Sequence, residues 1–88
     1  MMKVVKFGGS SLADAGQIQK AAAIIKAEAD RRYVVPSAPG KRFKDDIKVT
    51  DMLYQCYALA EKGEAFATQL AAIKNRYVSI LNGLSMPE

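Results

Sequence analysis

The clearest chemistry in the sequence lies in one short run near its start, Lys6-Phe7-Gly8-Gly9-Ser10-Ser11. Paired glycines carry no Cβ atoms, so the backbone N–H groups of such a turn can approach an anion closely. The serine hydroxyls add further donors. The lysine adds a point charge on a flexible stem, which can follow a transferring phosphoryl group. The run therefore predicts a phosphate-binding turn with Lys6 as its cation.

This run matches neither of the two commonest phosphate-binding motifs. A Walker loop would close with Gly-Lys-Ser/Thr, whereas Gly40-Lys41 is followed by Arg42. A dinucleotide-binding fingerprint needs a third glycine, which is missing here. From the residues alone, an ordinary tight turn with a surface lysine explains the run equally well.

The segments around this run predict a strand before it and a helix after it. Residues 2–7 are rich in valine and stop at the glycine pair, as a short strand does. Asp14 and Gln17 have the spacing of a helix N-cap and its partner, and apolar residues recur at helical spacing from there to residue 30. A second strand over residues 33–35 stops at Pro36. Strand, helix and strand predict a βαβ unit with parallel strands.

This arrangement would place the glycine run where α/β proteins bind their ligands. In open α/β sheets, ligands bind outside the carboxyl ends of the strands. Side chains alternate along a strand, so Lys6 can face a ligand there while Phe7 packs inward. Parallel sheets are normally buried on both faces. We therefore expect two strands and three helices to leave strand edges and apolar helix faces exposed.

The second half of the chain predicts a long loop and two helices. Residues 37–48 contain helix breakers and mixed charges, and we expect this loop to be poorly ordered. Thr50 is expected to be the N-cap of the next helix, which Gly63 ends. The packed face of that helix is expected to hold Leu53, Cys56, Tyr57 and Ala60. A last helix is expected over residues 65–82, ended by Gly83. Its apolar stripe would hold Phe66, Leu70, Ile73, Tyr77, Ile80 and Leu81.

Three motifs, in order along the chain, resemble the signatures of aspartokinases. The first is similar to the string that opens members of that family and is the most specific of the three, Lys6-Phe7-Gly8-Gly9-Ser10-Ser11. The second resembles the family's second strand and Ser-Ala loop, Val34-Val35-Pro36-Ser37-Ala38-Pro39-Gly40. The third resembles the start of the next helix, Lys48-Val49-Thr50-Asp51-Met52-Leu53. The resemblance covers essentially the whole chain, with the last helix matching only in kind.

The resemblance implies an α/β fold, the N-terminal βαβ portion of an amino-acid-kinase (carbamate-kinase-like) sandwich followed by two helices. Residues 1–88 would be a partial amino-acid-kinase domain, with the regulatory ACT domains of the family absent. Aspartokinases transfer the γ-phosphate of ATP to the side-chain carboxylate of L-aspartate, the first step toward lysine, threonine and methionine. The fragment alone is expected to be inactive, because the family's catalytic aspartate and adenine-binding loops would lie beyond it.

The resemblance also implies roles for individual residues. The ATP phosphates would be held by residues of the glycine run, namely Lys6, Gly8, Gly9 and Ser10. Lys6 would be the catalytic residue, because charge on the transferring group must be neutralised. Thr50 and Ser37 would contact the aspartate substrate. Mg²⁺ would accompany ATP, and no metal ligand is assigned within the chain. For Ser37 a plain turn role stays open, and Thr50 can cap a helix as well as contact substrate.

Two other functions stay open. One is a different amino-acid kinase of the same fold, acting on another carboxylate or a carbamate. The other is a stand-alone, non-enzymatic module that binds an anion. The net charge of +4 is spread among acidic residues, so a nucleic acid is not an expected partner. No apolar run approaches the length of a membrane span, so no membrane is expected either.

The cysteine and histidine content narrows the chemistry further. Cys56 is the single cysteine and the chain has no histidine, which excludes a zinc site and any triad with a histidine base. A lone cysteine is typical of a reducing compartment, so we expect the cytoplasm. The expected partners are the small molecules ATP and L-aspartate, and the parent enzyme is expected to be a homo-oligomer.

Overall fold

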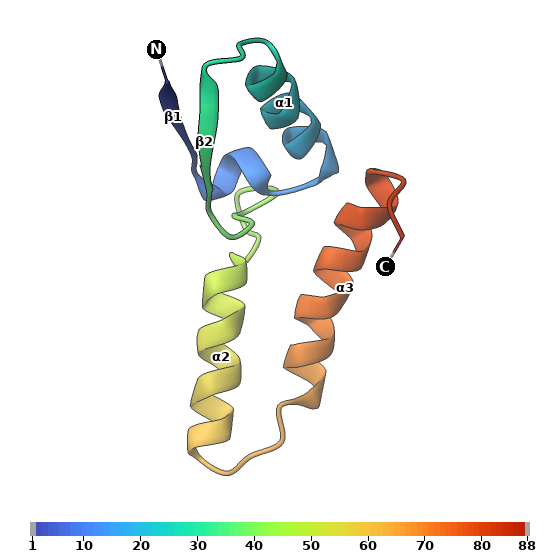
Figure 1. Ribbon diagram of the computed structural model, residues 1–88. Helices are drawn as coiled ribbons and strands as arrows, with labels where there is room; N and C mark the ends of the chain where they lie inside the picture. The colour runs from blue at the N-terminus through green and yellow to red at the C-terminus, as the bar shows by residue number, and fades with distance from the viewer. Residues whose placement is uncertain (1, 88) are drawn as a thin grey trace.

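The computed structural model of the chain describes residues 2–87 and has an α/β fold (Figure 1). Its elements follow in the order β1 (Lys3–Phe7), the 3₁₀ turn η1 (Gly9–Leu12), α1 (Ala15–Lys26), β2 (Arg31–Pro36), α2 (Val49–Glu61) and α3 (Ala67–Gly83). The two strands and α1 gather at one end of an elongated molecule measuring 51 × 26 × 26 Å. From there α2 runs outward, and α3 returns beside it toward α1.

The predicted βαβ unit is confirmed. The two strands form a parallel pair, with Lys6 opposite Val35 and Phe7 opposite Pro36. The second strand begins at Arg31, two residues before the predicted start, because Arg31 pairs with Lys3 in the ladder. The preceding helix accordingly ends at Lys26 rather than residue 30. The Arg31 guanidinium donates to the carbonyl of Ile24 near the end of that helix, where the chain turns back into the sheet.

The predicted entry into α1 is also confirmed. Asp14 is the N-cap, and its carboxylate accepts a hydrogen bond from the backbone N–H of Gln17 at 3.0 Å. The 3₁₀ turn η1 precedes this cap. Local capping chemistry therefore determines how the chain leaves the glycine run.

The predicted start of α2 is wrong. The helix begins at Val49, Lys48 is its N-cap, and no side chain caps it. The Val49 N–H donates instead to the carbonyl of Pro39 at 3.1 Å, and the Val49 side chain is 1% exposed. This long-range bond and this burial, rather than a hydroxyl cap, set where the helix begins. Thr50 therefore lies within the first turn.

The predicted packed face of α2 is correspondingly displaced. The residues that pack against α3 are Val49, Met52 and Cys56, which form a core with Ile73. Leu53 and Tyr57, expected inside, are exposed. In α3, Ile73 and Ile80 of the predicted stripe are buried, whereas several of its other members are exposed: Phe66, Leu70 and Tyr77.

The two glycines predicted to end helices do different things. Gly63 follows the C-cap of α2, as predicted, and has φ of +73°. Its N–H donates to the carbonyl of Ala60 and the Glu64 N–H donates to that of Leu59, which forms a Schellman motif. Gly83 is the last residue of α3, but a Cβ there would lie 2.5 Å from the Cβ of Ala15. It therefore permits close packing of α3 on the start of α1.

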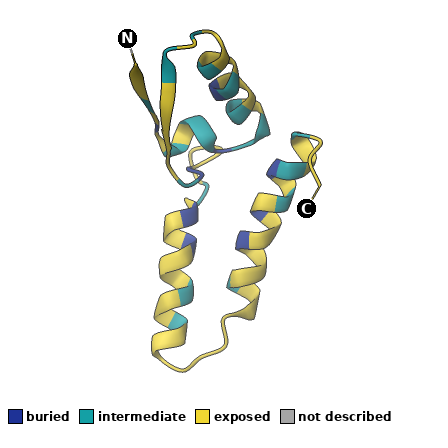
Figure 2. Cartoon of the chain, viewed as in Figure 1, coloured by how far each residue is buried: buried dark blue, intermediate teal, exposed yellow. Residues whose placement is uncertain are grey.

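Much of the chain's apolar surface is exposed, as expected for so small a sheet. Val4 is 71% and Val35 is 49% exposed, so the strands are not covered on both faces (Figure 2). The buried apolar residues are Phe7, Ala13, Ala21, Val49, Met52, Ile73 and Ile80. Within residues 2–87, no helix combines the length and apolar character needed to cross a membrane.

Candidate functional site

The glycine run turns sharply as it leaves β1. Phe7 is buried and Lys6 is exposed, as strand alternation predicts. Gly8 then adopts φ −76° and ψ 172°, and its carbonyl accepts a hydrogen bond from the Ser11 N–H at 3.1 Å. A Cβ placed on Gly8 would meet nothing within 4 Å. The space beside Gly8 is therefore open to a ligand.

Gly9 faces protein rather than open space. A Cβ there would lie 3.1 Å from the Cα of Gly40, and the Gly9 carbonyl accepts the Gly40 N–H at 2.8 Å. The reverse contact is tighter, since a Cβ on Gly40 would come within 2.6 Å of the Gly9 carbonyl carbon. The glycine run and the loop of residues 37–48 thus meet backbone to backbone, which only small residues permit.

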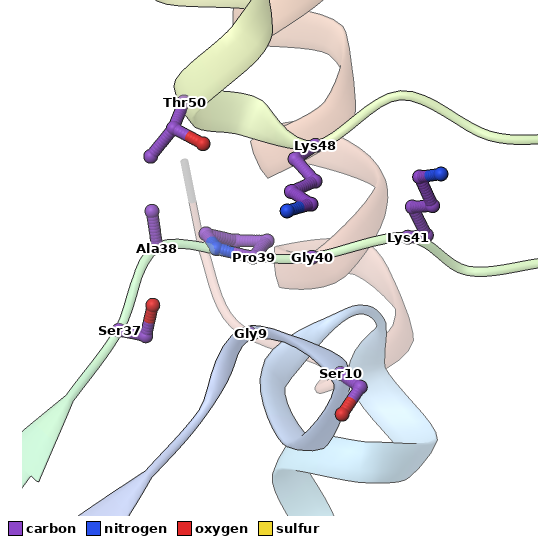
Figure 3. A pocket seen from close by; sticks show the side chains of 9 residues that line it. All are labelled: Gly9, Ser10, Ser37, Ala38, Pro39, Gly40, Lys41, Lys48 and Thr50. Carbon is purple, nitrogen blue, oxygen red and sulfur yellow. The ribbon is translucent and has the colours of Figure 1, made fainter.

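The same loop holds the start of α2 against this contact. Pro39, next to Gly40, accepts the Val49 N–H at 3.1 Å, so the helix begins one residue before Thr50. The Thr50 hydroxyl makes no hydrogen bond that caps the helix. In Figure 3 the Thr50 and Lys48 side chains lie on the same side of the segment of residues 38–40, and the Ser37 hydroxyl points toward the Ala38 end of this segment.

These contacts enclose an open cavity of about 380 Å³. Its lining consists of Gly9, Ser10, Ser37, Ala38, Pro39, Gly40, Lys41, Lys48 and Thr50 (Figure 3). Four of the predicted site residues, from three separate parts of the chain, are therefore brought together: Gly9, Ser10, Ser37 and Thr50. Lys6 and Gly8 are not part of the lining and lie just before it along the chain.

Two cations of the lining were not predicted. Lys41 and Lys48 border the cavity, and none of the ion pairs seen between residues 2 and 87 involves either of them. No carboxylate joins them in the lining. Their positive charge favours an anionic ligand. The sequence signal was their closeness to Gly40 and Thr50, but both lie among acidic residues that indicated a solvated loop.

Arg76 is the most important residue that the sequence did not reveal. It lies on α3 and is 4% exposed. Its guanidinium donates to the carbonyls of Ile47 at 2.8 Å, Ala13 at 3.1 Å and Gly40. Position 76 shares a helical stripe with Ile73 and Ile80, so the spacing itself held the signal that this arginine is buried.

The loop of residues 37–48 is held from within as well. Asp46 accepts hydrogen bonds from the Arg42 backbone at 2.9 Å and from the Arg42 guanidinium at 2.6 and 3.0 Å. These bonds lower the pKa of Asp46 far below its usual range, and they raise the pKa of Arg42. Together with the bonds to Gly9 and Arg76, they hold the loop in place. These contacts favour an ordered loop, and the expectation that it is poorly ordered stays a prediction.

A model of the amino acid kinase family matches residues 1–85. The chain belongs to this family. Among its members, Aspartokinase 3 of Bacillus subtilis (strain 168) is 46% identical over 86 residues, which is 97% of this chain and 19% of that protein.

Two solved kinase structures each contain a region with the fold of this chain. An aspartate kinase from Clostridium acetobutylicum superposes with a TM-score of 0.92 at 46% identity, covering 97% of this chain and 20% of that one. Aspartokinase III of E. coli, in complex with aspartate and ADP in its R-state, superposes with a TM-score of 0.68 at 35% identity. This match covers 93% of this chain and 17% of that one. The chain spans about a fifth of the length of these relatives.

The amino acid kinase chain offers little to a metal ion in the part that the structure describes. Residues 2–87 contain no group of three or more His, Cys, Asp or Glu side chains that could hold one. Cys56, half-buried on α2, forms no disulfide. The chemistry of this site is that of cations, hydroxyls and backbone N–H groups.

Proposed function

We propose that this chain is part of an aspartokinase, which transfers the γ-phosphate of ATP to the side-chain carboxylate of L-aspartate. Membership of the amino acid kinase family and the 46% identity to Aspartokinase 3 support this assignment. The observation that carries it is the cavity in which the glycine run meets Ser37 and Thr50. A glycine turn that can bind a phosphate and hydroxyls that can bind the acceptor thus border one cavity. Phosphoryl transfer requires that the two substrates be held next to each other in this way.

The ATP phosphates would lie along the glycine run. Gly8 leaves its side open, Gly9 and Ser10 border the cavity, and the exposed Lys6 precedes them on β1. The lysine stem is flexible enough to bring its ammonium to the transferring group. In this proposal Lys6 is the catalytic residue, because it neutralises charge that develops on the phosphoryl oxygens.

The aspartate substrate would be held by Thr50 and Ser37. Thr50 is exposed at the cavity, and no cap hydrogen bond occupies its hydroxyl. The neighbouring Lys48 adds a positive charge beside it. A hydroxyl donor next to a cation suits a dicarboxylate acceptor, because both groups stabilise its negative charge.

The remaining features of the parent enzyme follow from this assignment. Residues 1–88 would form part of an amino-acid-kinase domain. Mg²⁺ would arrive with ATP and be bound through its phosphates. We place the enzyme in the cytoplasm, where the unpaired Cys56 stays reduced, and we expect it to be a homo-oligomer.

The test is an acceptor screen with the full-length protein. Purified enzyme is incubated with Mg-ATP and, separately, with L-aspartate, L-glutamate, N-acetylglutamate or carbamate, and ADP release and acyl-hydroxamate formation are measured. We expect both signals with L-aspartate, and neither from the 88-residue chain alone. Turnover with a different acceptor would assign another member of the family, and binding of phosphate compounds without turnover would indicate a non-enzymatic module.

A further inference from the structure

The buried guanidinium of Arg76 is placed to act on the site without touching it. Arg76 does not line the cavity, yet its three hydrogen-bond acceptors all belong to segments that form or flank it. Ala13 follows η1, and Ile47 and Gly40 lie in the loop of residues 37–48. A single side chain from α3 therefore joins the exit of the glycine run to both halves of the loop.

The bond to Gly40 leads directly to the glycine run. The Gly40 carbonyl accepts from Arg76, while the N–H of the same residue donates to the Gly9 carbonyl at 2.8 Å. The backbones of Gly40 and Gly9 also pack so closely that neither tolerates a Cβ without movement. The position of Gly9 consequently depends on the position of Gly40, which Arg76 holds.

Packing alone does not account for an arginine here. Its Nε finds no hydrogen-bond partner among residues 2–87, a cost that an apolar side chain of similar length would avoid. The nearest carboxylate is Asp46, at 3.9 Å, and that group is already bonded to Arg42. What a planar guanidinium provides is a rigid fork that reaches several carbonyls at once, which a lysine ammonium does not reproduce.

We propose that Arg76 is a positioning residue for phosphate binding. By holding the Gly40 carbonyl, it fixes the Gly40–Gly9 contact and thereby the backbone N–H groups that meet the nucleotide phosphates. This inference rests on the proposed kinase function. It assigns a role in the ATP site to a residue of α3, an element that contributes no lining residue to the cavity.

The test compares variants of the full-length kinase by steady-state kinetics and thermal unfolding. Arg76→Met and Arg76→Lys alter the fork, and Gly40→Ala perturbs the same contact from the loop side. Ile80→Ala is the matched control, because Ile80 is buried on the same helix and makes no hydrogen bond to the loop through its side chain. All assays are run well below the lowest unfolding temperature of the set.

We expect Arg76→Met to lower kcat/KM for ATP by up to about 100-fold, since small displacements of a positioning group have effects of that size. Arg76→Lys should recover only part of this loss. The Arg76→Met/Gly40→Ala double variant should have a kcat/KM for ATP only slightly below that of the less active single variant. The two effects should not add, because both changes break the same contact. Ile80→Ala should lose a comparable amount of thermal stability while its kcat/KM for ATP stays unchanged.

Two results would overturn the inference. One is a folded Arg76→Met or Arg76→Lys variant with the kcat/KM of the unaltered enzyme. The other is an Ile80→Ala variant that loses as much activity as Arg76→Met at equal stability.

If the unaltered protein transfers phosphate to no acceptor, the proposed function fails separately. In that event, hydrogen exchange at the Gly40 amide still decides the coupling. Exchange should accelerate in Arg76→Met far more than in Ile80→Ala, and equal acceleration would refute the role of Arg76.

Discussion

The two ends of the α2–α3 hairpin are built in opposite ways. At the end beside the loop, Val49, Met52 and Ile73 form a core and Arg76 is buried with its hydrogen bonds. At the outer end, apolar side chains such as Leu70 are exposed, and Figure 2 shows both helices mostly exposed there. The chain's own contacts are concentrated where the cavity is, and the outer hairpin has few of them.

This contrast indicates which parts of the molecule are ordered by their own residues. Each buried apolar side chain contributes about 1.5–3 kcal/mol, and the hydrogen bonds around Gly40 add to this at the cavity end. The outer part of the hairpin instead has exposed apolar side chains, such as Tyr57 and Leu70. Where exposed apolar side chains form a large patch, the patch usually binds a further segment or subunit. The chain's own contacts therefore form the cavity, whereas the outer part of the hairpin leaves apolar side chains exposed.

The largest expected effect breaks the core at the cavity end. Ile73→Ala should destabilise the 88-residue chain by about 2–5 kcal/mol, because the side chain is buried against Val49 and Met52. Leu70→Ala, one turn earlier and 52% exposed, should change stability by less than about 0.5 kcal/mol. Urea unfolding followed by circular dichroism measures both. Equal losses would mean that the two ends do not differ.

The next effect separates chemistry from folding at Lys6. Because Lys6 is exposed, Lys6→Ala should leave the unfolding temperature of the full-length kinase unchanged. It should lower kcat by about 10²–10³-fold, the usual cost of losing one charge-stabilising donor. Steady-state kinetics with Mg-ATP and aspartate provide the measurement. An unchanged kcat with only a raised KM for ATP would mean that Lys6 binds the nucleotide uniformly and has no catalytic part.

A smaller effect distinguishes the two glycines of the run. Gly8→Ala should fold normally, because its Cβ would meet no protein atom within 4 Å and its φ of −76° suits any residue. It should raise KM for ATP about tenfold, which corresponds to about 1.4 kcal/mol, because the added Cβ would occupy the space proposed for the phosphates. Gly9→Ala should instead lower the unfolding temperature, since its Cβ would press on Gly40. The reverse pattern would place the phosphates beside Gly9 alone.

The smallest effect is a pH dependence carried by Asp46. Its pKa is held below the usual value by Arg42, so its stabilising contribution is complete above the unfolded pKa of about 3.9 and is lost as pH falls toward the folded value. Asp46→Asn should therefore be less stable than the unaltered chain at pH 6, and the difference should narrow below about pH 4. Urea unfolding at several pH values measures it. A constant difference would show that charge is not its cause.

The sequence predicted the features that depend on local signals. The Asp14 cap and the Gly63 helix end follow from residues within a few positions of one another. The parallel βαβ unit follows from the order of its elements, each predicted from a local pattern, and from the preference for right-handed crossovers. The predicted start of α2 was wrong. A hydrogen bond from the Val49 N–H to the Pro39 carbonyl and the burial of Val49 override the capping preference of Thr50. These are tertiary effects, which no local pattern contains.

The candidate site shows the same division. Glycines, hydroxyls and Thr50 were recognisable by type and motif, and four of the six predicted residues border one cavity. Lys41 and Lys48 were not predicted as site residues, because the charges of a loop are usually interpreted as solvent-exposed. Only the folded path of the loop shows that both border the cavity. Arg76 was not predicted because the segments that it joins, near residues 13, 40 and 47, are distant in sequence.

The most direct test of the account concerns Thr50, because the central claim is that one cavity holds both the phosphates and the acceptor. In the full-length kinase, Thr50→Val should raise KM for aspartate about tenfold, as for one lost hydrogen bond to a charged group, and leave KM for ATP nearly unchanged. Stability should not fall, since the hydroxyl caps no helix, and Thr50→Ser should retain the affinity for aspartate. Equal effects of Thr50→Val on both substrates, or a folded Thr50→Ser variant no better than Thr50→Val, would contradict the claim.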